Sequence, residues 1–359
     1  MKRVLVVLNS DLIRAGVPNV VMTIARGLSD KFVFDAVTYG TAAGDYDSEF
    51  EALGGRIYRL SLLDYDSHKL TYPMRFFQIK KALNKILKGT AYDIIHCHNG
   101  IEAGIFLSLA NKHGILKRIA HAHGNYTRGG SNKILLWYHN FCKKLIHRHA
   151  TDRLACSSVA GETLYSCDDF LNVLNCVDTS LYVNLPKQHH DTVNLLQIGY
   201  FCQNKNQLFS IKLLKELLSR SLPARLSFIG FKQGEEYYND MLKAISDLEL
   251  DNYVNFLPPD TDKTKVFPFT DAVLLPSFSE GLPLVALEAQ ASNTYCIASD
   301  RVPKDADLGL VRFAALDDTD AWCSAIKDLD FSGDKPRVNI DAIDRNCWIK
   351  RIEDIYNAG

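Results

Sequence analysis

The sequence predicts an α/β fold of two doubly wound, Rossmann-like domains that face each other across a cleft. Three observations lead to this prediction. The chain has 359 residues, which is more than one hydrophobic core usually supports. Short apolar runs rich in β-branched residues alternate with amphipathic stretches of helical spacing. The alternation stops at a polar stretch near residue 185 and then begins again, which indicates two domains in tandem.

The first half alternates predicted strands with predicted helices. The strands are expected at residues 4–8, 32–37, 94–97, 118–121 and 153–156. The helices are expected at residues 20–28, 72–87, 103–112 and 134–147. Because this order is typical of parallel sheets with helices on both faces, we expect one such sheet here.

The second half repeats this organisation after a polar, proline-containing linker at residues 185–191. Its strands are expected at residues 193–198, 225–229, 254–257, 272–275 and 295–298, and its helices at 207–218, 236–248, 283–291 and 340–357. We therefore predict a first domain over residues 1–185, a second over 186–339 and a terminal segment over 340–359.

Charge is distributed unevenly. The net charge is −1, but residues 1–185 hold 22 Lys/Arg against 16 Asp/Glu (+6), and the remainder holds 19 against 26 (−7). This asymmetry indicates two domains with different partners, the first facing something anionic such as a lipid surface or a lipid-linked phosphate; the alternative is chance and solubility alone. Nine scattered cysteines without a Cys-x-x-Cys pair are typical of reduced thiols in the cytoplasm.

The segment after the strand at 272–275 carries the strongest functional signal. Pro283 fits the first turn of a helix, so the amides of Gly281 and Leu282 are expected at its N-terminus, where backbone N–H groups favour a phosphate. Glu288 lies inside that helix and suits two ribose hydroxyls. Glu280 precedes the helix at a strand end, where it meets a sugar; the alternative is a partner for the helix dipole.

Two His-x-His pairs close neighbouring strands, at His96 and His98 and at His121 and His123. We expect the two rings of each pair to point to opposite faces, so that one histidine of each pair lies at the ligand edge and no metal is shared. His123 is favoured because Gly124 and Asn125 follow it and open the backbone to a ligand. The acidic triplets at 45–47, 64–66 and 260–262 lie in turn-like stretches, and we predict no metal there.

Two further positions are weak signals taken alone. Gly199 ends a strand and leaves room for a ligand, and Lys205 stands before a helix, where it can reach phosphate oxygens. Gly16 lies in the loop after the first strand and before a helix, which suits an anion. The alternatives are an ordinary surface lysine and an ordinary strand-to-helix turn.

The motif Glu280-x7-Glu288, in a Ser-x-x-Glu-Gly-x-Pro context, resembles the retaining GT-B glycosyltransferases of family 4, particularly those that build bacterial capsule, exopolysaccharide and O-antigen. The resemblance covers essentially the whole chain. It includes the strand at 93–98, the strand end at 121–124, residues 198–199 with 205–206, and the final helix with Trp348 and Tyr356. It implies an acceptor-binding first domain, a nucleotide-sugar-binding second domain and a final helix that crosses back to the first.

The resemblance also implies roles for individual residues. Glu280 would contact the hydroxyls of the donor sugar, and Glu288 the ribose. Gly281 and Leu282 would donate amides to the diphosphate, and Lys205 would neutralise it beside Gly199. The remaining roles concern the first domain: the reacting sugar would lie near His123, with His121 as the alternative, and Gly16 and Asn125 would border the donor phosphate and the acceptor.

Two departures from the family pattern concern the diphosphate. The arginine that usually follows the glycine at 199 is replaced by Tyr200, and the first loop, usually two glycines followed by a glutamate, reads Ala-Gly-Val-Pro-Asn at residues 15–19. Losing the arginine removes a charge-assisted clamp worth about 1.5–3 kcal/mol. We therefore expect Lys205 to carry more of the diphosphate charge than in typical relatives.

The expected activity is transfer of a hexosyl group from a uridine diphosphate sugar to a lipid-linked or oligosaccharide acceptor, with retention of configuration. No cofactor, metal or nucleic acid is expected. The alternatives are a sugar-nucleotide epimerase and a non-catalytic protein that binds glycans or a partner. We expect a cytoplasmic protein. The basic stretch 72–89 is interpreted as a core-packed helix with a solvated lysine face, and the alternative is contact with an anionic membrane.

Overall fold

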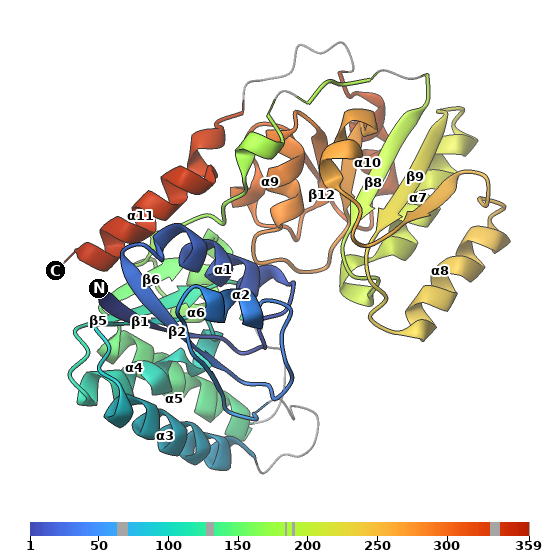
Figure 1. Ribbon diagram of the computed structural model, residues 1–359. Coiled ribbons are helices and arrows are strands. Elements are labelled where there is room, and N and C mark those ends of the chain that lie inside the picture. The colour runs from blue at the N-terminus through green and yellow to red at the C-terminus, as the bar shows by residue number, and fades with distance from the viewer. Residues whose placement is uncertain (63–70, 127–132, 184, 189–190, 331–337, 359) are drawn as a thin grey trace. The chain divides into compact units, whose positions relative to one another are not determined.

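The computed structural model describes residues 1–62, 71–126, 133–183, 185–188, 191–330 and 338–358, and it contains two compact units (Figure 1). One unit comprises Met1–Asn175 together with Arg345–Gly359, and the other comprises Cys176–Asp344. The first boundary lies ten residues before the expected one at 185, and the second lies five after the expected one at 339. Residues 64–66 and 189–190, which belong to predicted features, lie outside the described part.

The first unit contains a seven-stranded sheet among its described residues, in the order β3-β2-β1-β4-β5-β6-β7, with all pairs parallel. The sheet forms because each apolar run is covered on both faces; residues 4–7 of β1 are fully buried. The strands are β1 (Lys2–Val7), β2 (Phe32–Thr38), β3 (Ile57–Arg59), β4 (Ile94–Cys97), β5 (Lys117–Ala122), β6 (Asp152–Ala155) and β7 (Leu171–Asn172).

Three helices pack side by side on one face of this sheet: α3 (Thr71–Gly89), α4 (Ala103–Lys112) and α5 (Lys133–His149) (Figure 1). The other helices of the unit are α1 (Gly16–Leu28), α2 (Asp47–Ala52), α6 (Ser158–Tyr165) and α11 (Arg345–Asn357). Helices α1 and α11 approach closely, because a Cβ atom at Gly27 would lie 2.3 Å from Cδ1 of Ile349. The last helix is therefore part of the first unit, and it begins at Arg345 rather than at the expected residue 340.

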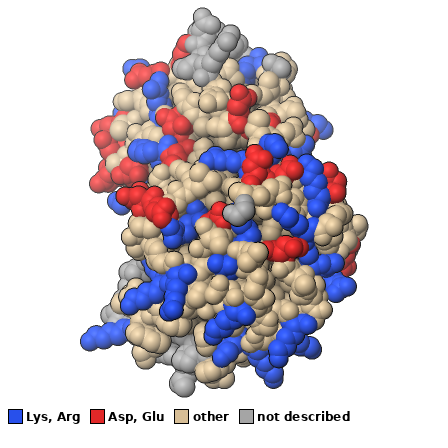
Figure 2. Space-filling view, turned by 90° about the vertical axis from the view of Figure 1, so that its left-hand side faces the viewer, with Lys and Arg blue, Asp and Glu red and all other residues tan. Residues whose placement is uncertain are grey.

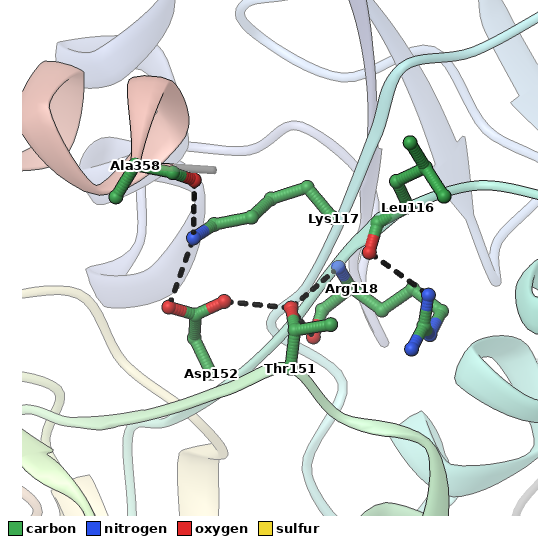
Figure 3. A network of polar contacts seen from close by, with 6 residues as sticks. All are labelled: Leu116, Lys117, Arg118, Thr151, Asp152 and Ala358. Carbon is green, nitrogen blue, oxygen red and sulfur yellow. Dashed lines mark hydrogen bonds and ion pairs between the residues drawn. The ribbon is translucent and has the colours of Figure 1, made fainter.

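Polar contacts fix the end of α11 at the edge of the sheet where β5 and β6 begin (Figure 3). Lys117 Nζ lies 3.0 Å from Asp152 Oδ1 and donates to the carbonyl oxygen of Ala358 at 3.1 Å. The Thr151 hydroxyl donates to Asp152 Oδ2 at 2.6 Å. These contacts hold the chain end at the amino edge of the strands, away from their carboxyl ends.

The second unit contains a six-stranded parallel sheet among its described residues, in the order β10-β9-β8-β11-β12-β13. Its strands are β8 (Val193–Ile198), β9 (Ala224–Ile229), β10 (Val254–Leu257), β11 (Ala272–Leu275), β12 (Tyr295–Ser299) and β13 (Val311–Ala314). Its helices are α7 (Gln207–Ser219), α8 (Glu235–Asp247), α9 (Leu284–Ala291) and α10 (Thr319–Lys327). A core around Phe228 and Trp322 joins the sheet to α7, α8 and α10.

Every strand predicted from the sequence is present, and the short edge strands β3, β7 and β13 were not predicted. An edge strand pairs with a neighbour on one side only. It can therefore be short and lack the long apolar run from which the other strands were predicted. Among the described residues, no helix is long and apolar enough to cross a membrane.

Candidate functional site

Each sheet has a position where the strand order reverses, and these positions locate the candidate sites. In the second unit the order runs one way from β8 to β10 and the other way from β11 to β13, so the reversal lies between β8 and β11. In the first unit it lies between β1 and β4. Ligands of open parallel sheets bind beyond the carboxyl ends of the strands at such positions.

Lys205 and Glu280 meet at the reversal in the second unit. Lys205 lies in a short 3-10 turn (Gln203–Lys205) after β8, and Glu280 follows β11. Lys205 Nζ lies 2.5 Å from Glu280 Oε1, and both side chains are largely buried. Asn204 ties the two loops together, because its carbonyl accepts from the Phe278 N–H and its Nδ2 donates to the Ser279 carbonyl, both at 2.9 Å. Lys205, predicted to contact the diphosphate, and Glu280, predicted to contact the donor sugar, are therefore in direct contact.

Gly199 leaves β8 with φ +149°, a backbone conformation that favours glycine. A Cβ atom there would lie 3.4 Å from Cε of Lys205, in ordinary contact. The Gln197 side chain also donates to the Lys205 carbonyl at 2.7 Å. Gly199 thus sets the direction in which the loop leaves the strand, and the loop carries Lys205 to Glu280. Tyr200, which stands in place of the arginine, is exposed, with its ring centroid 6.2 Å from that of Phe231.

Glu288 is buried in α9 and has two partners that the sequence did not reveal. Its carboxylate forms an ion pair with Lys263 from the 3-10 turn Lys263–Lys265, and it accepts a hydrogen bond from the Tyr182 hydroxyl at 3.3 Å. Burial, and then the charge of Glu288, raise the pKa of Tyr182, so its hydroxyl stays protonated and donates. The carboxylate is therefore held by a cation and a hydroxyl that lie 25 and 106 residues away in the chain.

The predicted position of Pro283 in the first helical turn is wrong by one residue. Pro283 has φ −72° and ψ 114°, which is extended backbone, and it is the N-cap of α9. The helix begins at Leu284, so Gly281 and Leu282 belong to the loop before it rather than to its N-terminus. Leu282 is buried, and the Ala286 N–H donates to the Pro283 carbonyl. The proposed phosphate contacts of Gly281 and Leu282 would come from this loop.

The histidines at the ends of β4 and β5 form a stacked array in the first unit, consisting of His96, His98, His121 and His123. The ring centroids within each His-x-His pair are only 4.1 Å apart, which contradicts the expectation that the two rings point to opposite faces. The expectation was wrong because only successive residues of a strand alternate between faces, whereas residues two apart, as in each pair, lie on the same face.

Hydrogen bonds connect the histidine array. His98 Nδ1 lies 2.8 Å from His123 Nε2, and His96 Nε2 lies 3.2 Å from His121 Nδ1. His96 Nδ1 is 2.8 Å from the hydroxyl of Tyr356 in α11. Burial lowers the pKa of His123 to about 3, and burial is the first cause that lowers the pKa values of the other three well below their usual range. All four rings are therefore neutral at pH 7 and serve as hydrogen-bonding groups.

One nitrogen from each of His96, His98 and His121 lies within 4.8 Å of the others, which is near enough to consider a metal ion. Both nitrogens of His96 are already engaged, by Tyr356 and by His121. Only Nε2 of His98 and Nε2 of His121 are buried without a hydrogen-bond partner, and two ligands fall short of the three that a catalytic zinc site takes from the protein. We therefore assign no metal here.

Gly16 and Asn125, predicted to border the donor phosphate and the acceptor, both lie beyond strand ends of the first unit. Gly16 is the first residue of α1, and nothing lies within 4 Å of the position that a Cβ atom would take. Asn125 is exposed, two residues after His123. The next residue, Tyr126, accepts a hydrogen bond from the His123 backbone N–H at 3.2 Å.

A cavity of about 470 Å³ opens elsewhere in the first unit, at the amino edge of its sheet. Its polar lining groups contact one another: Lys2 donates to Asn357 at 3.2 Å, and Lys117 pairs with Asp152. Because ligands of parallel sheets bind at the carboxyl edge, we interpret this cavity as part of the anchorage of α11.

Two family models match parts of the chain, one in each half. Residues 15–166 match the glycosyl transferase 4-like domain, and residues 192–329 match the glycosyl transferases group 1. The Bacillus subtilis protein EpsF is 28% identical over 349 residues, covering 90% of this chain and 87% of EpsF. The capsular polysaccharide biosynthesis glycosyltransferase CapH of Staphylococcus aureus is 24% identical over 296 residues, covering 81% of this chain and 79% of CapH.

Solved structures of other proteins share the fold of this chain. Anabaena HepE in complex with UDP aligns with a TM-score of 0.77 at 14% identity, covering 99% of both chains. This likeness confirms the predicted pair of Rossmann-like domains.

Proposed function

Because the chain carries a glycosyl transferase 4-like domain and a glycosyl transferases group 1 domain on the GT-B fold, we propose that it moves a hexosyl group from a uridine diphosphate sugar to a lipid-linked or oligosaccharide acceptor. The acceptor belongs to bacterial surface polysaccharide synthesis. The transfer retains the anomeric configuration, as the resemblance to family 4 implies.

The observation that carries this proposal is the Lys205–Glu280 pair at the strand-order reversal of the second unit. The diphosphate leaving group gains negative charge as the glycosidic bond breaks. A cation already fixed at the carboxyl edge stabilises that charge without reorganisation in the transition state. Glu280, next to the cation, then accepts hydrogen bonds from the hydroxyls of the sugar.

Glu288 supplies the nucleoside part of the same proposed site. A carboxylate at this place binds two vicinal ribose hydroxyls. Lys263 and Tyr182 hold it in a fixed orientation, since both contact Oε1. Support for uridine comes from HepE, whose structure contains UDP, and support for polysaccharide synthesis comes from CapH.

The first unit supplies the acceptor side in this proposal. His123, neutral at pH 7, offers a hydrogen-bonding ring beside the exposed Asn125. Because Lys205 is the proposed electrophilic group, transfer takes place without a metal or cofactor. We place the reaction in the cytoplasm, in keeping with nine scattered cysteines that include no Cys-x-x-Cys pair.

A thermal-shift panel of uridine, guanosine and adenosine diphosphate sugars tests the donor site, because a ligand raises apparent stability by mass action. We expect a shift with uridine derivatives that is lost in Lys205→Ala. Incubation with the donor alone separates transfer from epimerisation, since an epimerase would produce a new sugar nucleotide. No shift with any donor, together with full complementation by Glu280→Ala, would favour a non-catalytic binding protein.

A further inference from the structure

The outer surface formed by α3 and α5 in the first unit exposes large apolar side chains. Met74, Phe77 and Trp137 are 60%, 64% and 66% exposed, and Ile134 and Leu136 are exposed as well. The opposite face of α3 is packed in the core, where Ile79 and Leu83 are fully buried. The sequence-based interpretation of the stretch 72–89 as a core-packed helix with a solvated lysine face is therefore incomplete, because its first turns also present apolar groups outward.

Aromatic contacts make this surface continuous across the two helices. The rings of Phe77 and Phe76 are 5.6 Å apart, and Phe76 contacts Phe141 of α5 edge-on at 6.2 Å. Phe141 stacks on Trp137 at 5.6 Å with an interplanar angle of 8°. We call this surface, with its flanking basic residues, the α3–α5 patch.

The basic residues of the patch follow the apolar ones along each helix. On α3 the outward stripe reads Met74, Phe77, Lys81, Lys85 and Lys88, with spacings of three or four residues. On α5 the same spacing gives Ile134, Trp137, Phe141, Lys144 and Arg148. Each helix is thus apolar toward its beginning and basic toward its end.

Charge in the patch has one sign. Neither α3 nor α5 contains an aspartate or glutamate. Among the described residues, the exposed lysines 81, 85, 88 and 144 form no ion pair. Figure 2 shows the lower end of the first unit with blue side chains set among tan ones. An anionic partner is therefore the complementary one.

The direction of the helices relates the patch to the ligand edge. Both α3 and α5 follow a strand of the parallel sheet and precede the next, so both begin on the side of the carboxyl ends. Their exposed apolar residues hence lie toward the edge where His98 and His123 are found. A lipid surface touching these residues would be close to the acceptor side of the first unit.

We propose that the α3–α5 patch docks on an anionic lipid bilayer, with Phe77 and Trp137 entering the interface and the lysines contacting the headgroups. Aromatic rings favour the boundary between headgroups and acyl chains, and basic side chains near an anionic surface are attracted to it. Docking itself does not depend on the proposed transferase activity. The purpose that we assign to docking, which is to bring the protein to a lipid-linked acceptor, rests on the proposed transferase function.

Intrinsic fluorescence offers a direct measurement, because Trp322 and Trp348 are buried and Trp137 is the exposed tryptophan of the three. Vesicles of phosphatidylcholine with 30% phosphatidylglycerol are added to the full-length protein. We expect a blue shift of the emission, quenching by brominated acyl chains, and co-sedimentation at least tenfold stronger than with phosphatidylcholine alone. The shift should disappear in Trp137→Phe, whereas co-sedimentation should persist.

Two sets of variants separate the apolar and the charged contributions. Phe77→Ser with Trp137→Ser should reduce co-sedimentation at least tenfold, while Leu116→Ser, at an exposed apolar residue elsewhere in the unit, should not. Replacing Lys81, Lys85 and Lys88 by glutamine should remove the preference for anionic lipid. The matched control replaces three exposed lysines of the second unit, Lys212, Lys243 and Lys327, by glutamine. Circular dichroism checks that each variant is folded.

Several outcomes would overturn the proposal. Equal binding to neutral and anionic vesicles, or binding that the control triple variant weakens as much, would contradict an anionic membrane. Absence of vesicle binding would do the same. If the Phe77 and Trp137 variant instead changed only the mass measured by light scattering, the patch would be an interface between copies of this chain. Loss of donor binding with docking intact would contradict the proposed function and leave the docking proposal standing.

Discussion

Lys205 and Glu280, 75 residues apart in the chain, form an ion pair with 2.5 Å between Nζ and Oε1 where β8 and β11 end side by side. The glutamate thus compensates the charge of the lysine. A diphosphate that binds there must compete for the ammonium group, and the freed carboxylate can then accept hydrogen bonds from the sugar. In the proposed donor site, the pair would couple phosphate recognition to sugar recognition.

Lys205→Ala should lower kcat/KM for the donor by about tenfold to a hundredfold, because one charge-assisted hydrogen bond is worth about 1.5–3 kcal/mol. Tyr200 offers no second cation to replace it. Steady-state release of UDP measures the effect, and Lys205→Arg should recover part of it. The control Lys215→Ala removes an exposed lysine of α7 and should leave kcat/KM unchanged. Wild-type kcat/KM in Lys205→Ala would remove this lysine from the diphosphate site.

Lys263→Ala should raise KM for the donor about tenfold with little change in kcat. The ion pair with Lys263 orients Glu288, and a ribose contact made equally in the ground and transition states contributes to binding alone. Lys265→Ala is the matched control, since this exposed lysine lies two residues away in the same turn. A fall in kcat at constant KM would instead place Glu288 in the chemical step.

The histidine array should make stability sensitive to acid. The pKa values of its four members are lowered in the folded state, to about 3 for His123. The folded protein therefore binds these protons only at a lower pH than the unfolded chain does. Stability is therefore unaffected by these groups above the unfolded pKa, near 6.5, and falls as the pH drops below it. Each histidine contributes about 1 kcal/mol of destabilisation between pH 6.5 and 5.5.

Urea unfolding at pH 7.5, 6.5 and 5.5, followed by circular dichroism, measures this acid sensitivity. His98→Gln should reduce the loss of stability between pH 6.5 and 5.5 by about 1 kcal/mol, because one proton fewer is taken up on unfolding. A free energy of unfolding that is constant over this range, or an unchanged slope in the variant, would show that the array protonates in the folded state.

The fold follows from the sequence to a large extent, because each buried strand carries its own apolar run and each run is visible locally. The candidate site follows only in part. Glu280 and Glu288 stand in a recognisable motif, yet Lys263 and Tyr182 reach Glu288 from distant segments that have no local pattern. The stacking within each histidine pair, by contrast, could have been read from the spacing, because residues two apart in a strand lie on the same face.

Two glycines of α1 allow a last test, because they differ in what surrounds them. A Cβ atom at Gly16 meets nothing within 4 Å, whereas one at Gly27 would lie 2.3 Å from Ile349 Cδ1. Gly27→Ala should therefore destabilise the protein by about 1–3 kcal/mol through overpacking of α1 against α11, with activity retained by the folded fraction. Gly16→Ala should leave the free energy of unfolding within about 0.5 kcal/mol of the wild type and lower kcat/KM, since the added methyl group projects into the space proposed for phosphate and acceptor. Urea unfolding and UDP release are measured on both variants. Full activity in Gly16→Ala would place the ligand away from the start of α1.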